Sequence, residues 1–244
     1  MSGLLIAQGP LACYFVNAGL RNLYLWPLAK PFSRELFVYI PPKLQLDQAQ
    51  ACELIKREPF ALLISAEGGI EASHLPLILS DCGTRLYGHM ARANPQWQEL
   101  DGKSVLAIFS GPHAYISPNW YAKGPAVPTW NYTAVQVKGR VTLLEGAQAM
   151  DTLMETVNRF EPGLLSGVLM PADYVARLSA AIVAFEIQIE KIEGKAKLGQ
   201  QRKSDDQQGV TAGLEASTHR EAGALLAEMY RLNLGLGLED KASE

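Results

Sequence analysis

The sequence predicts an α+β fold in which helices surround an antiparallel β-barrel. Compact apolar segments of strand length follow one another closely, at residues 60–66, 71–79 and 85–89. Turn residues separate them, Glu67-Gly68-Gly69 in the first gap and Asp81-Cys82-Gly83 in the second. Strands joined by such short turns run antiparallel, so the sequence does not predict a doubly wound parallel sheet.

A helix is expected before the first strand, over residues 47–57. Asp47 can accept a hydrogen bond at its start, and Gln50 stands three residues further on, where its side chain can reach back to the cap. Apolar residues recur with helical spacing behind this cap. Pro59 ends the helix, because proline lacks the N–H group that a helix interior needs.

The middle of the chain continues with short elements. Asn94, followed by a proline, predicts the start of a short helix over 94–100, since asparagine caps helices and proline is favoured at their first position. A buried strand is expected over 104–110. Residues 112–128 are interpreted as irregular and aromatic, and residues 132–144 as a long strand of alternating apolar and polar side chains.

The C-terminal part is expected to be mainly helical around one last strand. The predicted elements are helices over 147–160 and 172–178 and a strand over 182–192. Residues 200–208 are polar and are interpreted as a linker. A final helix follows this linker, and Thr218 and Glu221 form a capping-box pattern at its start.

The chain divides into three predicted parts: an N-terminal extension at residues 1–35, a folded domain at 36–214, and a C-terminal helix and tail at 215–244. The extension is rich in apolar residues, but polar residues and prolines interrupt it, so no apolar run reaches the roughly 20 residues of a membrane helix. We interpret it as a poorly ordered appendage; the alternative is a peripheral anchoring segment.

Composition and charge narrow the function classes. Of the 244 residues, 48% are hydrophobic and 19% charged, which is ordinary for a soluble globular protein. The formal net charge of −3 gives no overall basic surface for nucleic acid, and no helix-turn-helix pattern stands out. The three cysteines lack paired or metal-ligand spacing, which favours a reducing cytoplasm. Fingerprints of dinucleotide sites, phosphate loops and zinc proteases are absent.

Residues able to bind a ligand gather in the segment 73–131. Three of the four histidines lie here (His74, His89 and His113), together with amides, hydroxyls and tryptophans. Such a set suits a flat, polar ring system with an anionic tail. Arg92 is expected to bind phosphate as a planar fork, and the helix that begins at Asn94 offers N–H groups to the same anion. In the alternative reading, His74 and His89 are strand histidines that are hydrogen-bonded in the core, and His113 has a structural role before a bend. Arg92 is then a surface residue or forms a salt bridge in a dimer.

Five segments resemble signatures of the PaiB family, whose members are described as FMN-binding proteins and negative transcriptional regulators. They are Ala72-Ser73-His74-Leu75-Pro76-Leu77, Gly88-His89-Met90-Ala91-Arg92-Ala93-Asn94-Pro95-Gln96-Trp97, Gly111-Pro112-His113-Ala114-Tyr115-Ile116-Ser117-Pro118, Val127-Pro128-Thr129-Trp130-Asn131-Tyr132 and Ile192-Glu193-Gly194-Lys195-Ala196-Lys197-Leu198. The resemblance covers residues 39–214, most of the chain.

The resemblance implies the split-barrel fold of pyridoxamine-phosphate oxidases and flavin reductases, which is antiparallel with peripheral helices. It also implies a homodimer with FMN at the interface, and it makes residues 36–214 the FMN-binding domain. The residues that it assigns to FMN are Ser73, His74, Leu75, Pro76, His89, Met90, Ala91, Arg92, Asn94, Thr129, Trp130, Asn131, Lys195 and Gln200. Trp130 and Asn131 could come from either subunit.

Three functions are open after the resemblance. The first is a PaiB-type negative transcriptional regulator that acts through flavin or a partner, without direct binding to nucleic acid. The second is an FMN-dependent oxidoreductase, similar to a flavin reductase or an oxidase, in which the flavin carries the chemistry. The third, an apo structural dimer whose site has decayed, is the least favoured because the leading motif residues are all present. No catalytic residue and no metal site is assigned, and FMN can be structural, sensory or catalytic. The protein is expected in the cytoplasm, without contact to a membrane.

Overall fold

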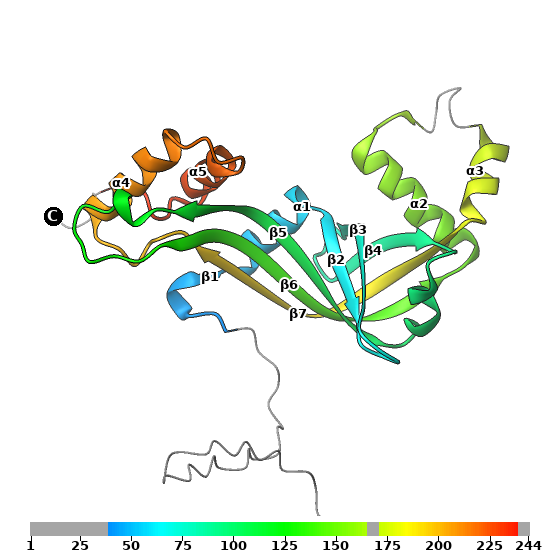
Figure 1. Cartoon of the computed structure of the whole chain (residues 1–244). Coiled ribbons are helices and arrows are strands. Elements are labelled where there is room, and N and C mark those ends of the chain that lie inside the picture. The colour runs from blue at the N-terminus through cyan, green and yellow to red at the C-terminus, as the bar shows by residue number, and fades with distance from the viewer. Residues whose placement is uncertain (1–38, 165–170, 239–244) are drawn as a thin grey trace, which may run out of the picture. The chain divides into compact units, whose positions relative to one another are not determined.

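A closed antiparallel barrel forms the centre of the computed structural model, which describes residues 39–164 and 171–238 (Figure 1). Its strands are β1 (Gln45–Leu46), β2 (Phe60–Ser65), β3 (Glu71–Leu79), β4 (Arg85–Ala91), β5 (Ser104–Ile116), β6 (Thr129–Leu144) and β7 (Ile182–Lys197). They are ordered β1-β7-β4-β3-β2-β5-β6, and β6 also pairs with β7. The strands β2 to β7 therefore close on themselves, and β1 adds to β7. The predicted fold class is confirmed.

Helices precede, interrupt and follow the barrel strands. They are α1 (Gln48–Arg57), α2 (Gly146–Phe160), α3 (Ala172–Ser179), α4 (Ser204–Glu215) and α5 (Ala222–Leu232), with short 3₁₀ helices η1 (Pro42–Leu44), η2 (Pro95–Glu99) and η3 (Pro118–Trp120). The capping box expected for α1 is confirmed: the Gln50 N–H donates to the Asp47 carboxylate at 2.8 Å, and the Asp47 N–H donates to the Gln50 side chain at 3.0 Å.

The core lies inside the barrel because side chains alternate between its two faces along each strand. On β2, Ala61 and Leu63 point inward and are fully buried, whereas Phe60, Leu62 and Ile64 point outward. Large buried side chains fill the interior, each worth about 1.5–3 kcal/mol when fully buried. Among them are Leu54, Ile55, Leu77, Leu86, Phe109, Phe185 and Ile187.

Strand β5 is longer than expected. The prediction that residues 112–128 are irregular is wrong for their first part, because β5 continues to Ile116. Its register against β6 shifts between Ser110 and His113, and the shift absorbs Pro112. Proline has no N–H group for a ladder of hydrogen bonds, and the register shift lets β5 pass through Pro112.

The connection expected at residues 200–208 is also partly wrong, because α4 begins at Ser204. Helix α4 presents Gly209 and Gly213 to Trp120 of η3. A Cβ atom on Gly209 would collide with the Trp120 carbonyl oxygen, and one on Gly213 would collide with the indole. Tertiary packing therefore stabilises a helix in a segment whose polar composition suggested a linker.

The start of α5 differs from the prediction as well. A capping box needs the acidic residue inside the first helical turn, but Glu221 is itself the residue that precedes α5, and it makes no side-chain cap bond. The Ser217 hydroxyl instead accepts the His219 N–H at 3.1 Å, and His219 Nδ1 accepts the Glu221 N–H at 3.3 Å. The expected pairing of Thr218 with Glu221 is therefore wrong.

A buried ion pair ties α5 to α1. The side chain of Glu228 is 1% exposed, and it accepts hydrogen bonds from Arg231 at 2.8 and 2.9 Å and from Arg57 of α1 at 2.9 Å. Leu225 and Met229 of α5 are fully buried in the barrel core. Helix α5 is thus part of the packing of the barrel.

The N-terminal extension expected at residues 1–35 lies outside the described residues. In the described part of the chain, every helix is too short or too polar to cross a membrane.

Candidate flavin site

The first group of predicted site residues lies on the outer face of β3 and β4. Leu77 of β3 pairs with Gly88 of β4, so Pro76 stands next to His89 in the antiparallel register. Leu75 and Met90 point inward and are buried, which leaves His74, Pro76 and His89 on the outside. Because side chains alternate along strands, the signature segments present every second residue to this face.

His89 is the most distinctive member of this group. Burial lowers the pKa of its imidazole and so favours the neutral ring. Its Nδ1 atom is buried and has no hydrogen-bond partner among the described residues. His74 is exposed, and its ring stacks on Phe60 with centroids 5.9 Å apart. The alternative, in which His89 is hydrogen-bonded within the core, therefore does not account for its Nδ1 atom.

The turn after β4 is fixed to β3 by one amide. Asn94 Nδ2 donates to Ser73 Oγ at 2.8 Å, and Asn94 Oδ1 accepts the Gln96 N–H at 3.0 Å. Asn94 thus caps η2 as expected, but its side chain accepts the Gln96 N–H, which is then no longer free to bind an anion. Both ends of the Asn94 amide have partners within the chain, so Ser73 and Asn94 position this turn.

Arg92 uses two nitrogens to bind the backbone of its own chain. Nε donates to the Ala180 carbonyl at 2.9 Å and Nη2 to the Ile182 carbonyl at 2.8 Å, which holds the start of β7. The guanidinium lies 5.8 Å from the centre of the Trp97 ring, and Trp97 Nε1 donates to the Arg92 carbonyl. Nη1 has no partner among the described residues, so phosphate would meet one terminal nitrogen of an already fixed side chain.

The second group lies at the start of β6. Trp130 pairs with Tyr115 of β5, and its indole is 46% exposed. Lys197 of β7 donates to the Trp130 carbonyl at 2.8 Å and to the Thr129 hydroxyl. Asn131 points the other way and is buried. Lys197 lies in the signature segment 192–198, but it is not among the predicted FMN residues. Because Lys195 and Lys197 are two residues apart on one strand, their side chains lie on the same face, and this spacing could have indicated Lys197 as well.

Lys195 and Gln200 have structural partners. Lys195 Nζ donates to the Tyr39 carbonyl at 3.3 Å and lies 5.5 Å from the Tyr132 ring centre. Gln200 closes the turn after β7, where its Oε1 accepts the Leu198 N–H at 2.9 Å. Its Nε2 donates to the carbonyls of Ala196 and Lys43 at 2.7 and 3.1 Å. The amide of Gln200 is therefore used within its own chain.

The two groups are far apart in one chain. His74 lies level with Leu62 of β2, which pairs with Ile108 of β5, which pairs with Gln136 of β6. Trp130 precedes Gln136 by six residues on the same strand, or about 20 Å at 3.4 Å per residue. In Figure 1, β4 runs toward α2, whereas β6 begins near α4. A single chain does not bring His74 and Trp130 together.

An apolar surface separates the two groups. Outward-facing positions of the central strands normally carry polar side chains when they face water. Here they carry Phe60, Leu62 and Ile64 on β2 and Leu106 and Ile108 on β5. Phe60 is 65% exposed. This outer apolar face has the composition of a protein interface.

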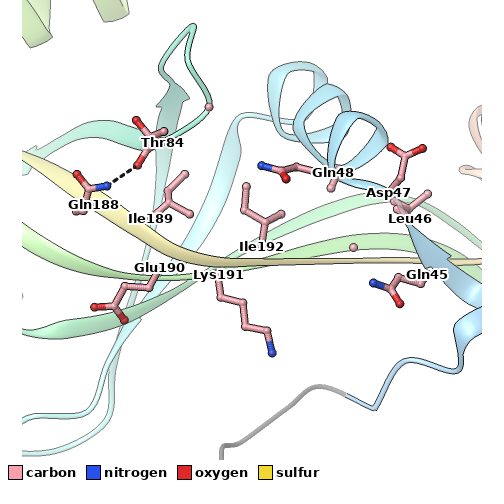
Figure 2. A pocket seen from close by; sticks show the side chains of 13 residues that line it. Gln45, Leu46, Asp47, Gln48, Thr84, Gln188, Ile189, Glu190, Lys191 and Ile192 are labelled. Atoms are coloured by element: carbon pink, nitrogen blue, oxygen red, sulfur yellow. Dashed lines mark hydrogen bonds between the residues drawn. The ribbon is translucent and has the colours of Figure 1, made fainter.

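A cleft of about 500 Å³ lies beside the part of β7 between Gln188, where its pairing with β4 ends, and Gly194, where its pairing with β1 begins (Figure 2). Ile189 and Ile192 point toward α1, whereas Glu190 and Lys191 point to the opposite side of β7. None of the predicted FMN residues lines this cleft.

The closed antiparallel barrel, with the predicted site residues in two groups on its strands, has the fold of the FMN-binding split-barrel proteins. Residues 38–191 match the family described as "Putative FMN-binding domain". "Protease synthase and sporulation protein PAI 2" of Bacillus subtilis is 33% identical over 187 residues, which cover 73% of this chain and 89% of that protein. The chain belongs to the PaiB family. The predicted family and its cofactor, FMN, are confirmed.

Two solved structures have a similar fold. The flavocytochrome Anf3 from Azotobacter vinelandii gives a TM-score of 0.54 at 19% identity, over 64% of this chain and 71% of that chain. The FAD and heme binding protein from Mycobacterium smegmatis gives 0.52 at 16% identity, over 64% of this chain and 74% of that chain. At these identities the likeness shows the fold alone.

Proposed function

We propose that this PaiB-family protein is a homodimer that binds FMN between its two chains. The observation that carries the proposal is the separation of the two residue groups. The β3–β4 group and the Trp130 group belong to different signatures of one family. His74 lies level with Gln136 of β6, about 20 Å along that strand from Trp130. A second chain that supplies the opposite group would complete each site.

The outer apolar face supports a second copy as the partner. In an interface with twofold symmetry, the same patch meets itself, so a residue i that contacts j is matched by j contacting i. Leu62, Ile64 and Ile108 lie on the strands between the two groups. Pairing of this face would bury them and would bring the β3–β4 group of one chain toward the Trp130 group of the other.

Several side chains fit FMN in such a site. FMN, when bound, supplies hydride and electron transfer, and the protein supplies binding and orientation. The unpaired Nδ1 of the neutral His89 can hydrogen-bond a polar ring edge, and the exposed indole of Trp130 can pack on a ring face. The Nη1 atom of Arg92 and the ammonium of Lys197 offer positive charge to a phosphate. The remaining polar residues of the predicted site already have partners within the chain, so they would support the site by fixing the turns and strands around it. They are Ser73, Asn94, Lys195 and Gln200.

The function that we favour is a negative regulator of transcription that acts through flavin or a protein partner. The name of the Bacillus relative, a protease synthase and sporulation protein, supports a regulatory role. The net charge of −3 does not favour direct binding to DNA. We place the protein in the cytoplasm, since the described cysteines Cys52 and Cys82 are not paired in a disulfide.

The alternative is an FMN-dependent oxidoreductase. It is favoured by His74 and Trp130, both exposed in the single chain, because a small electron donor can reach either half of the site wherever the second chain leaves it uncovered. NADH- or NADPH-dependent bleaching of the bound flavin would support this alternative. Flavin that stays oxidised with both donors would support the regulator.

Mixed dimers test the sharing of the site directly. His89→Ala damages the first group and Trp130→Ala the second, so each variant alone should lose FMN after desalting. When the two chains are refolded together in equal amounts, half of the dimers combine both variants, and each of these keeps one site with two intact halves. Flavin absorbance should then return to about a quarter of the wild-type value.

The outcome separates two arrangements. If each site lay within one chain, every chain in the mixture would carry a damaged site and no flavin would return. Wild-type protein purified with FMN, desalted and measured for its visible spectrum and its mass in solution is the reference. A colourless or monomeric wild type would contradict the proposal itself.

A further inference from the structure

A histidine beyond the matched family segment lies against the predicted flavin tryptophan. The match ends at residue 191, but His219, in the loop between α4 and α5, has its ring centroid 5.6 Å from that of Trp130 at an interplanar angle of 74°. Tyr115 and His113 of β5 lie near the same indole, at 6.2 and 6.1 Å. All four rings are exposed. Tyr115 and His219 meet the indole edge to face, and His113 is tilted to it at 39°; such ring pairs restrict the orientation of an aromatic side chain.

The imidazole of His219 is held in a defined state. Its Nδ1 accepts the Glu221 N–H at 3.3 Å, so the proton of the neutral ring is on Nε2. The N–H of His219 donates to Ser217 Oγ, and its carbonyl accepts the Ala222 N–H at 3.0 Å. In the described part of the chain, Nε2 has no hydrogen-bond partner. It is a donor that is held in place but unused.

The loop is also fixed relative to Trp130. On its N-terminal side, α4 is packed through its glycines against Trp120, in the connection that leads to β6. On its C-terminal side, α5 is anchored by Leu225 and Met229 in the core and by Glu228 on Arg57. A residue carried between two anchored helices can position a neighbour, because its own place does not depend on the ligand.

We propose that His219 is a positioning residue of the flavin site, which holds the Trp130 indole and offers its Nε2–H to a polar atom of FMN. This inference rests on the proposed function, in which Trp130 contacts the flavin. The C-terminal segment would then complete the site that the family signatures begin. Without His219, the Trp130 indole would keep Tyr115 and His113 of β5 as neighbours. It would lose the imidazole ring of His219 and the Nε2–H donor beside it.

Three single variants test the inference by titration of the apo dimer with FMN. His219→Ala removes the ring and the donor, and we expect its Kd to rise about tenfold, the usual effect of one lost hydrogen bond. His219→Phe restores the ring without the donor and should recover part of the affinity. Arg220→Ala is the matched control, since the side chain of this neighbour is 94% exposed and, among the described residues, has Glu221 as its ion-pair partner. It should bind FMN like the wild type.

Two further measurements separate positioning from a general structural effect. The visible circular dichroism of bound flavin should change in His219→Ala and return partly in His219→Phe, while the urea midpoint of the apo protein stays the same. Wild-type affinity and dichroism in His219→Ala, together with loss of FMN in Trp130→Ala, would overturn the role of His219 and leave the proposed function standing. Unchanged FMN binding in Trp130→Ala would overturn both.

Discussion

Replacement of Glu228 by glutamine tests how firmly the C-terminal helix belongs to the barrel. The carboxylate of Glu228 is 1% exposed and accepts four short contacts from two arginines, at 2.8 and 2.9 Å from each. Glutamine keeps the shape but removes the charge. The two guanidinium groups, Arg57 on α1 and Arg231 on α5, would then lose the negative charge and one of the two acceptor oxygens between them.

The expected loss in the free energy of unfolding depends on how deeply Glu228 and its two arginines are buried. A hydrogen bond to a charged group contributes about 1.5–3 kcal/mol, so the full set would exceed the cost of most single substitutions. The side chains of Arg57 and Arg231 are 32% and 31% exposed, so water can replace part of the hydrogen bonding that they lose in the variant. We expect a loss of about 2 kcal/mol in the free energy of unfolding at pH 7, or about 4–8 °C in Tm.

The effect should depend on pH. Burial alone would raise the pKa of the Glu228 carboxyl, but the hydrogen bonds and charges of Arg231 and Arg57 outweigh it and hold that pKa below its ordinary value of 4.5. The folded state therefore binds this proton more weakly than the unfolded state. The stabilisation is fully present above pH 4.5 and is lost as the pH falls through the folded pKa. The difference between wild type and Glu228→Gln should shrink below pH 4.5.

Urea denaturation at pH 7 and at pH 4 measures both effects. Glu53→Gln is the control, because Glu53 approaches the same Arg57 only to 4.0 Å and is 52% exposed. It should change stability by less than about 0.5 kcal/mol. A Glu228→Gln protein as stable as the wild type at pH 7 would refute the reasoning, and so would a loss that is equal at both pH values.

Two further predictions concern packing and a reactive thiol. Gly213→Ala places a methyl group against the Trp120 ring and should lower stability by about 1–3 kcal/mol in urea, whereas Gly223→Ala, on α5 with open space around it, should not. Hydrogen bonds with Ser80 and Thr84 lower the pKa of the Cys82 thiol to about 7, so its alkylation by iodoacetamide should rise to half its maximal rate near that pH. In Ser80→Ala the midpoint should move to higher pH, and an unmoved midpoint would remove Ser80 as the cause.

The order and type of most elements could be predicted because their signals are local. The cap of α1 needs only Asp47 and Gln50, three residues apart, and the first hairpins need only their turns. The continuation of β5 past Pro112 could not be predicted, since it depends on a register shift against β6. Helix α4 likewise depends on Trp120, a residue far from it in the sequence.

The site shows the same division. The signatures identified His74, His89 and Trp130 as candidates, but sequence order does not reveal that β3 and the start of β6 occupy different ends of the barrel. That separation arises from the order of the strands in the sheet. His219 carries no signature, and only folding of the C-terminal helices against the barrel brings it to Trp130.

The place of β7 in the sheet has a consequence for synthesis of the chain. Strands β2 to β6 emerge first and can form an open sheet in the order β4-β3-β2-β5-β6, with β4 and β6 as its two edges. Both edges pair with the same late strand, β7, which follows α2 and α3. Until β7 leaves the ribosome, the nascent protein exposes two unpaired edges, which can pair with other chains. We therefore expect the nascent chain to be most prone to aggregate while α2, α3 and β7 are being translated.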